Sequence, residues 1–400
     1  MSSVSRPNMS ATASVIASLD ELDASLFEDK ADRVRVRDAL YGALRRFQTP
    51  WNIGWDHVVT ANGGTAAIKA LIDAGVFEKW AEAGGGPMTC AEIAKLVDAD
   101  ELLIRRLMRC VAGQFLITET DLDTYARTPW AEALGDDHAL RAWYGGFYTE
   151  LVNPLLRSLP GFLKASGYRN PTDHDDCNFQ FWKGAGATFF GHVASNPLLT
   201  TDFNDAMEGN SRGNLTDWPD VYPTEQLLEG LKPDRAVVVD VGGGKGHDLI
   251  KFHVKHPQIP TSGLVLQDLP GILKDVPGDY KLETREYDFF TPQPVTGARA
   301  YFMHGVLHDW PDVKTVEILR VVAAAMEKGY SKLLVHENMV NERGAVARVT
   351  SLDMLMMAGL AAAERTEGQW ADVITGAGLR IVKIWRGMDR GECIIEAELA

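Results

Sequence analysis

The chain has 400 residues, of which 46% are hydrophobic and 24% are charged, as in an ordinary globular protein of two or three domains. Its formal net charge of −15 argues against a nucleic-acid partner, because the phosphates would be repelled. The four cysteines, Cys90, Cys110, Cys177 and Cys393, lie far apart and show no zinc-ligand spacing. We therefore expect free thiols in a reducing compartment, which favours the cytoplasm.

The amino-terminal segment predicts a tail followed by a helix. Residues 1–19 are rich in Ser and Ala and lack a long apolar run, so they indicate neither a signal peptide nor a membrane span. We expect residues 1–30 to be a flexible tail that helps to bury a partner subunit. Residues 32–47 place apolar side chains among many Arg and Asp, which is the pattern of an amphipathic helix.

Residues 65–126 predict three helices and a hairpin. The first helix is expected over residues 65–77, where it runs into a glycine stop. Thr89, with Glu92 three positions later, is a capping box for the second helix, and Asp100 begins the third. Three helices and a hairpin make a winged-helix arrangement, which suggests DNA binding. Because the chain is acidic, we expect a dimerisation scaffold here instead.

Residues 139–210 have a helical pattern that is rich in aromatic side chains. Most of these side chains are expected in the core, and a few could line a pocket for a flat substrate. We assign residues 31–215 to a helical dimerisation and substrate-lining domain with a winged-helix-like part.

Residues 216–400 alternate apolar runs with helical patterns and predict a doubly wound α/β sheet. Residues 236–241 are mostly β-branched, as in a central strand that is buried on both faces. Four glycines follow at once: Gly242, Gly243, Gly244 and Gly246. The next pattern, over residues 247–255, is helical, so the amides at its start would face a ligand. The glycines let that ligand approach the backbone closely.

The spacing of the glycine turn narrows the choice of ligand. Because residue 247 is His, the turn is not the G-x-G-x-x-G of dinucleotide enzymes, and no Gly-Lys-Ser/Thr ends it as in a P-loop. A second apolar run, residues 264–267, ends in Asp268. An acid at this place can accept hydrogen bonds from ribose hydroxyls. The alternative is a turn that only packs strand on helix, and Asp268 argues against it.

Further strands are predicted at 299–303 and 333–337, and the runs 379–385 and 393–398 predict an antiparallel pair at the sheet edge. In such sheets ligands bind beyond the carboxyl ends of the strands. Polar side chains collect at these ends: Asp240, Asp268, Asp288, His304, His308, Asp309 and Glu337. One acid alone could be a helix cap, but so many at one edge favour a site.

Seven motifs are together more specific than the glycine turn alone. They are VVVDVGGGKG at 237–246, LQDLP at 266–270, YDFF at 287–290, LHDWPD at 307–312, HEN at 336–338, DMLMMA at 353–358 and ERTE at 364–367. In these motifs the chain resembles the plant caffeate-type and fungal secondary-metabolite O-methyltransferases, which use S-adenosylmethionine (SAM). The resemblance covers almost all of the chain past residue 30. It implies a Rossmann-like methyltransferase sheet, an intertwined homodimer and a small phenolic, enolic or polyketide-type acceptor.

By position, the resemblance also implies where SAM is held. The cofactor-binding residues that it implies are Asp240, Gly242, Gly244, Asp268, Leu269, Asp288, Phe289 and His304. Asp268 would hold the ribose, and Asp288 with Phe289 the adenine. His304 stands where the plant enzymes have a lysine that contacts SAM, and Gly305 replaces a tryptophan, so the plant pocket should not be copied onto this chain.

The resemblance makes His308 the general base, with Asp309 beside it and with Glu337 and Glu364 flanking and fixing its ring. A neutral imidazole can take the acceptor proton near neutral pH, a contribution of roughly 10²–10⁴-fold. No metal is expected, because the sulfonium methyl group is already activated. Four side chains are candidates for the acceptor pocket: Met207, Met356, Trp182 and Phe190. The two methionines fall where the family clamps the acceptor ring.

Two other functions stay open. A relative of this fold could bind SAM and catalyse a dehydration or pericyclic step, but such a protein would not need His308 with both glutamates. A non-catalytic regulator could use the winged helix to bind DNA, which the negative charge disfavours. Neither alternative changes the expected fold.

Overall fold

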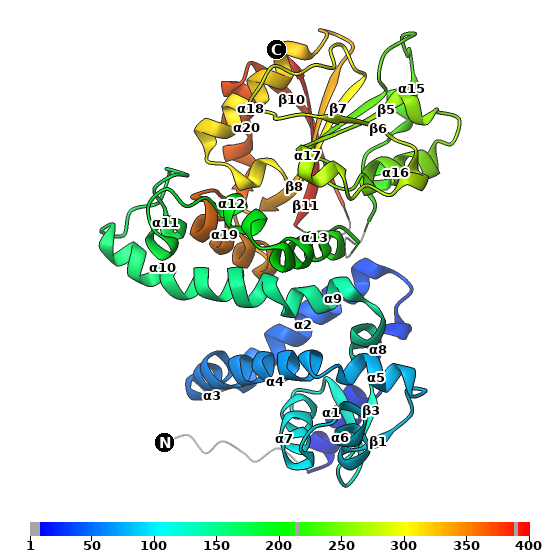
Figure 1. The fold of residues 1–400 in the computed structure, drawn as a ribbon, viewed down its shortest axis with the longest axis vertical. Helices are drawn as coiled ribbons and strands as arrows, with labels where there is room; N and C mark the ends of the chain where they lie inside the picture. The colour runs from blue at the N-terminus through cyan, green and yellow to red at the C-terminus, as the bar shows by residue number, and fades with distance from the viewer. Residues whose placement is uncertain (1–8, 213–215, 388–390) are drawn as a thin grey trace. The chain divides into compact units, whose positions relative to one another are not determined.

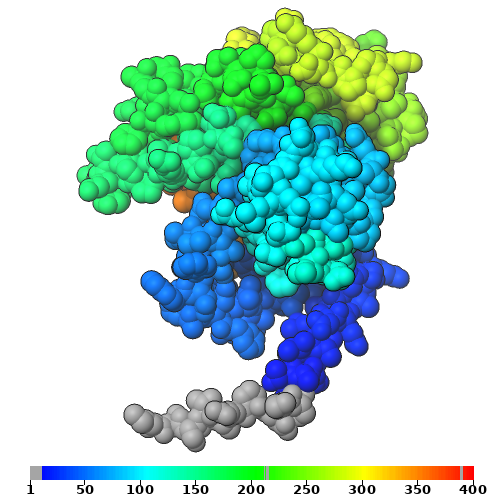
Figure 2. Space-filling view, turned by 60° about the horizontal axis from the view of Figure 1, so that its bottom comes forward, coloured from blue at the N-terminus to red at the C-terminus, as the bar shows by residue number. Residues whose placement is uncertain are grey.

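The structure is a computed structural model that describes residues 9–212, 216–387 and 391–400. The chain divides into two compact units, Met1–His57 and Val58–Ala400. Figure 1 draws the chain as a ribbon coloured from its amino to its carboxyl end, and Figure 2 is a space-filling view with the same colours. Within the described ranges, no helix has both the length and the apolar character that crossing a membrane requires.

The first unit is helical, and none of its described residues is buried. Its helices are α1 (Met9–Asp20), the short 3₁₀ helix η1 (Ala24–Leu26), α2 (Lys30–Phe47) and α3 (Pro50–Trp55). The division between the units falls within the π-helix η2 (Asp56–Thr60). α2 confirms the helix predicted over 32–47, and α1 lies within the segment expected to be a tail. Large apolar side chains are exposed on this unit, among them Leu40, Tyr41, Leu44, Phe47 and Trp51.

The second unit begins with the winged-helix-like part. Its elements are α4 (Ala61–Asp73), α5 (Val76–Glu82), β1 (Met88–Thr89), α6 (Cys90–Val97), α7 (Glu101–Ala112), β2 (Ile117–Asp121) and β3 (Thr124–Arg127). The predicted capping box forms: the backbone N–H of Glu92 lies 3.2 Å from Thr89 Oγ1, and Glu92 Oε2 accepts from the backbone N–H of Thr89 at 2.8 Å. Trp80, Met108 and Tyr125 belong to one buried core.

A set of helices follows this part. They are α8 (Pro129–Asp136), α9 (His138–Tyr144), η3 (Phe147–Val152), α10 (Asn153–Ala165), α11 (Asn178–Lys183), α12 (Phe189–Ser195) and α13 (Pro197–Arg212). Their apolar cluster includes Leu155 and Phe189 and continues to Met356 and Leu360 of the carboxyl-terminal part. The expected domain boundary at residue 215 is therefore bridged by a shared core.

The sheet has the order β10-β11-β8-β7-β4-β5-β6, with β9 paired to β8. Its strands are β4 (Val238–Val241), β5 (Leu264–Asp268), β6 (Glu283–Glu286), β7 (Ala300–His304), β8 (Lys332–Val340), β9 (Arg365–Thr366), β10 (Leu379–Arg386) and β11 (Glu392–Leu399). The strands β8, β7, β4, β5 and β6 run parallel to one another. β11 pairs antiparallel with β8 and with β10, so β10 and β11 form the predicted antiparallel pair at the edge. The strand order reverses at β4, and ligands bind at such a switch point.

Helices cover both faces of the sheet, α18 and α20 on one and α16 on the other (Figure 1). These and the neighbouring helices and turns are α14 (Trp218–Val221), α15 (Glu225–Leu228), α16 (His247–Lys255), η4 (Thr261–Gly263), α17 (Pro270–Leu273), η5 (Gly278–Tyr280), η6 (Leu307–Asp309), α18 (Asp312–Ala325), α19 (Ala347–Leu360) and α20 (Glu367–Gly376). Val239 packs in the core that contains Trp370, and Val238 in the core that contains Phe252. β4 is thus buried on both faces, as its apolar sequence predicts.

Candidate active site

The glycine turn follows β4 at the switch point of the sheet. Gly242, Gly244 and Gly246 have φ values of 75°, 58° and 83°, a region that side chains with a Cβ rarely adopt. A Cβ on Gly242 would also meet the side chain of Val306 at 2.9 Å and lie 3.9 Å from the ring of Phe289. The turn therefore needs glycine, and it brings the adenine candidate Phe289 next to the loop.

Asp268, at the end of β5, forms a hydrogen bond with the backbone of the glycine turn. Its Oδ2 accepts a hydrogen bond from the backbone N–H of Gly244 at 2.8 Å, and its Oδ1 accepts from Leu269 at 2.7 Å. Each oxygen keeps a second lone pair. Burial raises the pKa of this carboxyl, and the two backbone hydrogen bonds oppose that shift. The residue expected to bind ribose is thus preorganised on the loop.

Asp240 is buried, and neither of its carboxylate oxygens has a hydrogen-bond partner within the described chain. Burial, together with the charge of Asp248, raises its pKa well above the usual range, although the nearby charge of His304 opposes this. An unpaired buried carboxyl is costly. A ligand that brings a positive charge or hydrogen-bond donors to this side of the turn would satisfy it.

His304, at the end of β7, is anchored by a residue that sequence reasoning missed. Its Nδ1 lies 2.7 Å from Oδ2 of Asp248, the second residue of α16, and its ring stacks on His336 with the centroids 4.0 Å apart. Burial would lower the pKa of His304, but the charge of Asp248, the hydrogen bond to it and the charges of Glu392 and Glu337 together raise it. A side chain whose protonated form is favoured thus stands where the resemblance places a lysine.

Asp288 and Phe289 follow β6. Oδ1 of Asp288 accepts from the backbone N–H of Phe290 at 3.0 Å, and the ring of Phe289 packs edge-on against Trp310 with the centroids 5.9 Å apart. The YDFF and LHDWPD motifs therefore meet beside the glycine turn.

His308 lies in η6, surrounded by three carboxylates. Its Nδ1 is 2.6 Å from Oε1 of Glu364 and 3.9 Å from Oε2 of Glu337, and its Nε2 is 3.5 Å from Oδ1 of Asp309. Burial would lower the pKa of His308, but these three charges outweigh it and raise the pKa well above its usual range. Burial also raises the pKa of Asp309, to about 7, although the charge of His308 opposes this. A ring in this setting binds a proton firmly.

The two glutamates have different tasks. Glu364 binds the ring, whereas Glu337, from β8, uses Oε1 to accept hydrogen bonds from the backbone. The donors are the N–H groups of Val306, Leu307 and His308, at 3.1, 2.8 and 3.3 Å. We expected both glutamates to fix the ring. The close contact in the structure is that of Glu364, and Glu337 mainly holds the segment that carries the histidine.

Arg365 is a second residue that sequence reasoning missed. Its side chain is 1% exposed and donates to the carbonyl oxygens of Leu307 at 3.0 Å and Trp310 at 2.6 Å, while Nε lies 2.8 Å from Oδ1 of Asp312. Arg365 thereby ties β9 to the turn that carries His308. The one available signal was its place beside Glu364 in the ERTE motif.

The helix α19 supports Glu364 from the other side. It lies against η6, and Oδ1 of its Asp353 accepts from the backbone N–H of Glu364 at 2.9 Å. Met356 on the same helix is 8% exposed. This acceptor candidate therefore lies on a helix that borders the turn of His308.

The other three acceptor candidates lie on α11, α12 and α13. Met207 is 36% exposed and Phe190 is 38% exposed. Trp182 packs edge-on against Phe179 and borders a hollow of about 470 Å³ near Arg157. No contact in the described structure joins these three side chains to His308, so their role in the pocket stays a prediction.

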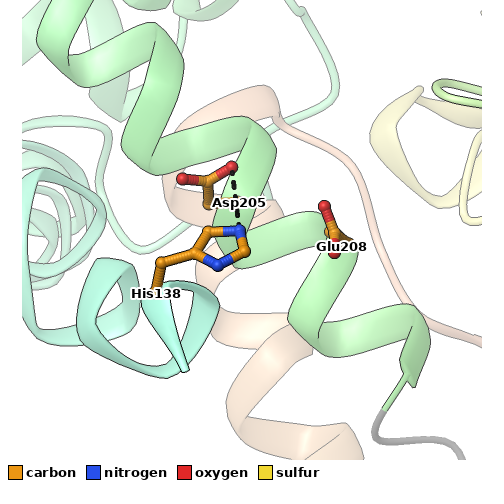
Figure 3. A group of neighbouring side chains, drawn as sticks. All are labelled: His138, Asp205 and Glu208. Atoms are coloured by element: carbon orange, nitrogen blue, oxygen red, sulfur yellow. Dashed lines mark ion pairs between the residues drawn. The ribbon is translucent and has the colours of Figure 1, made fainter. Parts of the chain in front are cut away.

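Within the described chain, one group of His, Asp and Glu side chains is close enough to hold a metal ion: His138, Asp205 and Glu208. Figure 3 shows His138 reaching from α9 toward Asp205 on α13, with Glu208 on the same helix. Both acids already form ion pairs with cations, Asp205 with Lys245 and Glu208 with Lys245 and Arg212. We therefore assign no metal site to this group.

Comparisons with known proteins agree with this geometry. Residues 169–380 match the family described as the O-methyltransferase domain, and residues 62–136 match the O-methyltransferase dimerisation domain. O-methyltransferase mfmE of Annulohypoxylon moriforme is 34% identical over 96% of this chain and 95% of its own. Demethylsterigmatocystin 6-O-methyltransferase of Aspergillus parasiticus is 31% identical over 86% of this chain and 88% of its own.

Solved structures give the same fold. The structure of LepI in complex with SAM matches with a TM-score of 0.89 and 26% identity, over 98% of this chain and all of the other. A structure described as a pericyclic reaction enzyme matches with the same values. The fold is therefore that of proteins which bind SAM.

Proposed function

Since the chain belongs to the O-methyltransferase family and is a SAM-dependent O-methyltransferase, we propose that it methylates a phenolic or enolic hydroxyl of a small aromatic or polyketide-type metabolite, with His308 as general base and without a metal. The acceptor class is supported by the name of the Aspergillus relative, an O-methyltransferase that acts on demethylsterigmatocystin.

One observation carries this proposal: Nδ1 of His308 lies 2.6 Å from a carboxylate oxygen of Glu364. That contact fixes the ring and leaves Nε2 to take the acceptor proton. Bound SAM supplies an activated sulfonium methyl group. A phenol has a pKa near 10, so a histidine whose pKa is raised holds the abstracted proton better than an ordinary one. Orienting the acceptor oxygen for in-line attack supplies much of the remaining acceleration.

The residues at the glycine turn fit the cofactor. SAM carries an ammonium and a sulfonium charge, and Asp240 offers a buried carboxyl without a partner. Each oxygen of Asp268 can accept one more hydrogen bond, as two ribose hydroxyls require. A Cβ on Gly242 would meet the side chain of Val306, so glycine is required where the turn passes that side chain.

The test is methyl transfer from SAM labelled at its methyl group to a panel of phenols and polyketides, using protein treated with a chelator. We expect one S-adenosylhomocysteine for each labelled product, detected by mass spectrometry, and no change when magnesium is added. An absolute requirement for magnesium, or product without S-adenosylhomocysteine, would contradict the proposal.

A second candidate function is a pericyclic or dehydration step that uses bound SAM without consuming it. The similarity to the pericyclic reaction enzyme favours it, because that fold match covers 98% of the chain. The close contact between His308 and the buried Glu364 argues against it, since such a step needs no methyl-transfer base. The same labelling experiment separates the two, because the alternative predicts a changed product with SAM left intact.

We also propose a homodimer in the cytoplasm, with neither nucleic acid nor membrane as a partner. The match to a dimerisation domain supports the dimer. So does the first unit, whose helices carry exposed apolar side chains and no buried residue, because an exposed patch of this kind marks an interface. Leu40, Leu44 and Phe47 recur at helical spacing on α2 and would face the second subunit.

We expect light scattering at micromolar concentration to give twice the 44.0 kDa of the chain. Replacing Phe47 and Trp51 with Ser should weaken the dimer, since both side chains are more than four-fifths exposed in the single chain. An Arg35→Ser variant, on the same unit, is the control and should stay dimeric. A wild-type monomer at this concentration would rule the dimer out.

A further inference from the structure

Lys245 lies inside the glycine turn but makes its contacts elsewhere. It stands between Gly244 and Gly246, and its Nζ is 3.3 Å from Oε2 of Glu208 and 3.7 Å from Oδ1 of Asp205. Both acids belong to α13, more than 35 residues earlier in the chain. The side chain of Lys245 therefore connects the turn expected to bind the cofactor with α13, a helix of the segment that precedes the sheet.

These ion pairs are partly buried. The side chain of Lys245 is 22% exposed, and those of Asp205 and Glu208 are each 18% exposed. An ion pair shielded from water is stronger than one on the surface, and losing one partner leaves a charge uncompensated. Arg212 adds a second cation, with Nε 3.7 Å from Oε1 of Glu208. Arg212 is shared with Asp137, from which its guanidinium lies 2.8 Å away, so Lys245 is the main cationic partner of Asp205 and Glu208.

The helix α13 connects several parts of the site. It carries Met207, a candidate for the acceptor pocket, directly before Glu208. Near its end, Oδ1 of Asn210 accepts a hydrogen bond from Arg348 of α19 at 3.1 Å, and α19 lies against the turn of His308. α13 is therefore in contact with the glycine turn on one side and with the helix beside the base on the other.

A cofactor bound at the glycine turn would restrict the backbone of the turn further than Asp268 alone does. Its glycines allow many backbone conformations, and among its side chains Lys245 alone carries a charge. Asp268 holds the turn through the N–H of Gly244, one residue away from Lys245. A ligand that fixes the backbone at Gly244 therefore also fixes the origin of the lysine side chain.

We propose that Lys245 is a positioning residue that couples occupation of the cofactor turn to the order of α13, so that the acceptor side becomes ordered when the cofactor is bound. The proposal rests on the proposed function only in taking α13 as the acceptor side. Lys245 itself is not a catalytic residue, because its contacts in the structure are with α13. Coupling of this kind is typically worth 5–150-fold between two sites.

The experiment is hydrogen exchange of the full-length protein with and without saturating S-adenosylhomocysteine. In the wild type we expect the product to slow exchange in α13 by about fivefold or more, at the low end of the coupling range. In Lys245→Met this slowing should be lost, while peptides around Asp268 are still protected. Lys245→Arg should restore it, because the charge returns. A matched control is Lys69→Met, which removes a lysine paired with Asp73 on α4 and should behave as the wild type.

Equal slowing of α13 in the wild type and in Lys245→Met would overturn the proposal, and so would the absence of slowing in the wild type. If Lys245→Met does not fold, the double variant Asp205→Asn/Glu208→Gln removes the same ion pairs from the other side and must show the same loss. Because no acceptor and no turnover are involved, a failure here is distinct from a failure of the His308 base, which only methyl transfer can reveal.

Discussion

Replacing His308 with alanine is expected to lower the turnover number by about 10²–10⁴-fold, the usual contribution of a general base. S-adenosylhomocysteine should still bind, because the imidazole contacts Glu364 and Asp309 and not the glycine turn. The measurement is single-turnover methyl transfer with the acceptor at saturation, beside calorimetry for the cofactor. His253→Ala, on α16 and outside the carboxylate group, is the matched control and should keep normal turnover.

A variant of Glu364, alone and combined with His308→Ala, tests whether this carboxylate acts through the histidine ring. Glu364→Gln should reduce turnover less than His308→Ala, since the base remains but loses its charged partner. The double variant should be hardly slower than His308→Ala alone, because groups that work as one unit are not additive. Independent, additive losses would mean that Glu364 acts on the acceptor in its own right.

Replacing Asp268 with alanine is expected to weaken cofactor binding by about 1–3 kcal/mol, the cost of losing hydrogen bonds to a charged group. Two effects combine here: the ribose loses its acceptors, and the N–H of Gly244 loses the carboxylate that positions the turn. Calorimetry with S-adenosylhomocysteine measures the change. Asp275→Ala, at an exposed aspartate just after α17, is the control, and an unchanged dissociation constant for Asp268→Ala would remove Asp268 from the cofactor site.

The core of the fold follows from local sequence. An uninterrupted β-branched run can be satisfied only by a strand covered on both faces, which is the position of β4 between two apolar clusters. The glycines after it are forced by backbone conformation and by the close approach of Val306. The β-branched run and the glycine cluster each lie within a few adjacent residues, so both can be recognised in the sequence, whereas the contact with Val306 cannot.

The group around His308 is different, because it joins residues 56 positions apart. The spacing of His308 and Glu364 carries no information on their contact, and only the resemblance to a family brought them together. For the same reason the tasks of the two glutamates could not be separated beforehand. The role of Arg365 could not be predicted, because it depends on hydrogen bonds to the backbone carbonyl oxygens of Leu307 and Trp310. Every residue has a backbone carbonyl, so the sequence does not indicate which ones an arginine binds.

The acceptor pocket was the least predictable part. In an aromatic-rich helical region every large side chain is an equal candidate, and packing decides which ones stay in the core. Trp182 illustrates this, since its ring packs against Phe179 and carries the ammonium group of Lys183 over its face at 3.9 Å. The exposed apolar residues of α2 are likewise expected to face a second subunit, which a single sequence does not display.

The central claim, that a histidine held by carboxylates takes the acceptor proton, is tested most directly by the pH dependence of single-turnover methyl transfer. The base must be neutral, so the rate should rise with pH, and the raised pKa of His308 should place the midpoint above the ordinary histidine value of about 6.5. Glu364→Gln removes a negative charge and should move the midpoint to lower pH. The account predicts that this acidic limb disappears in His308→Ala; a limb that persists there with a near wild-type rate would contradict it.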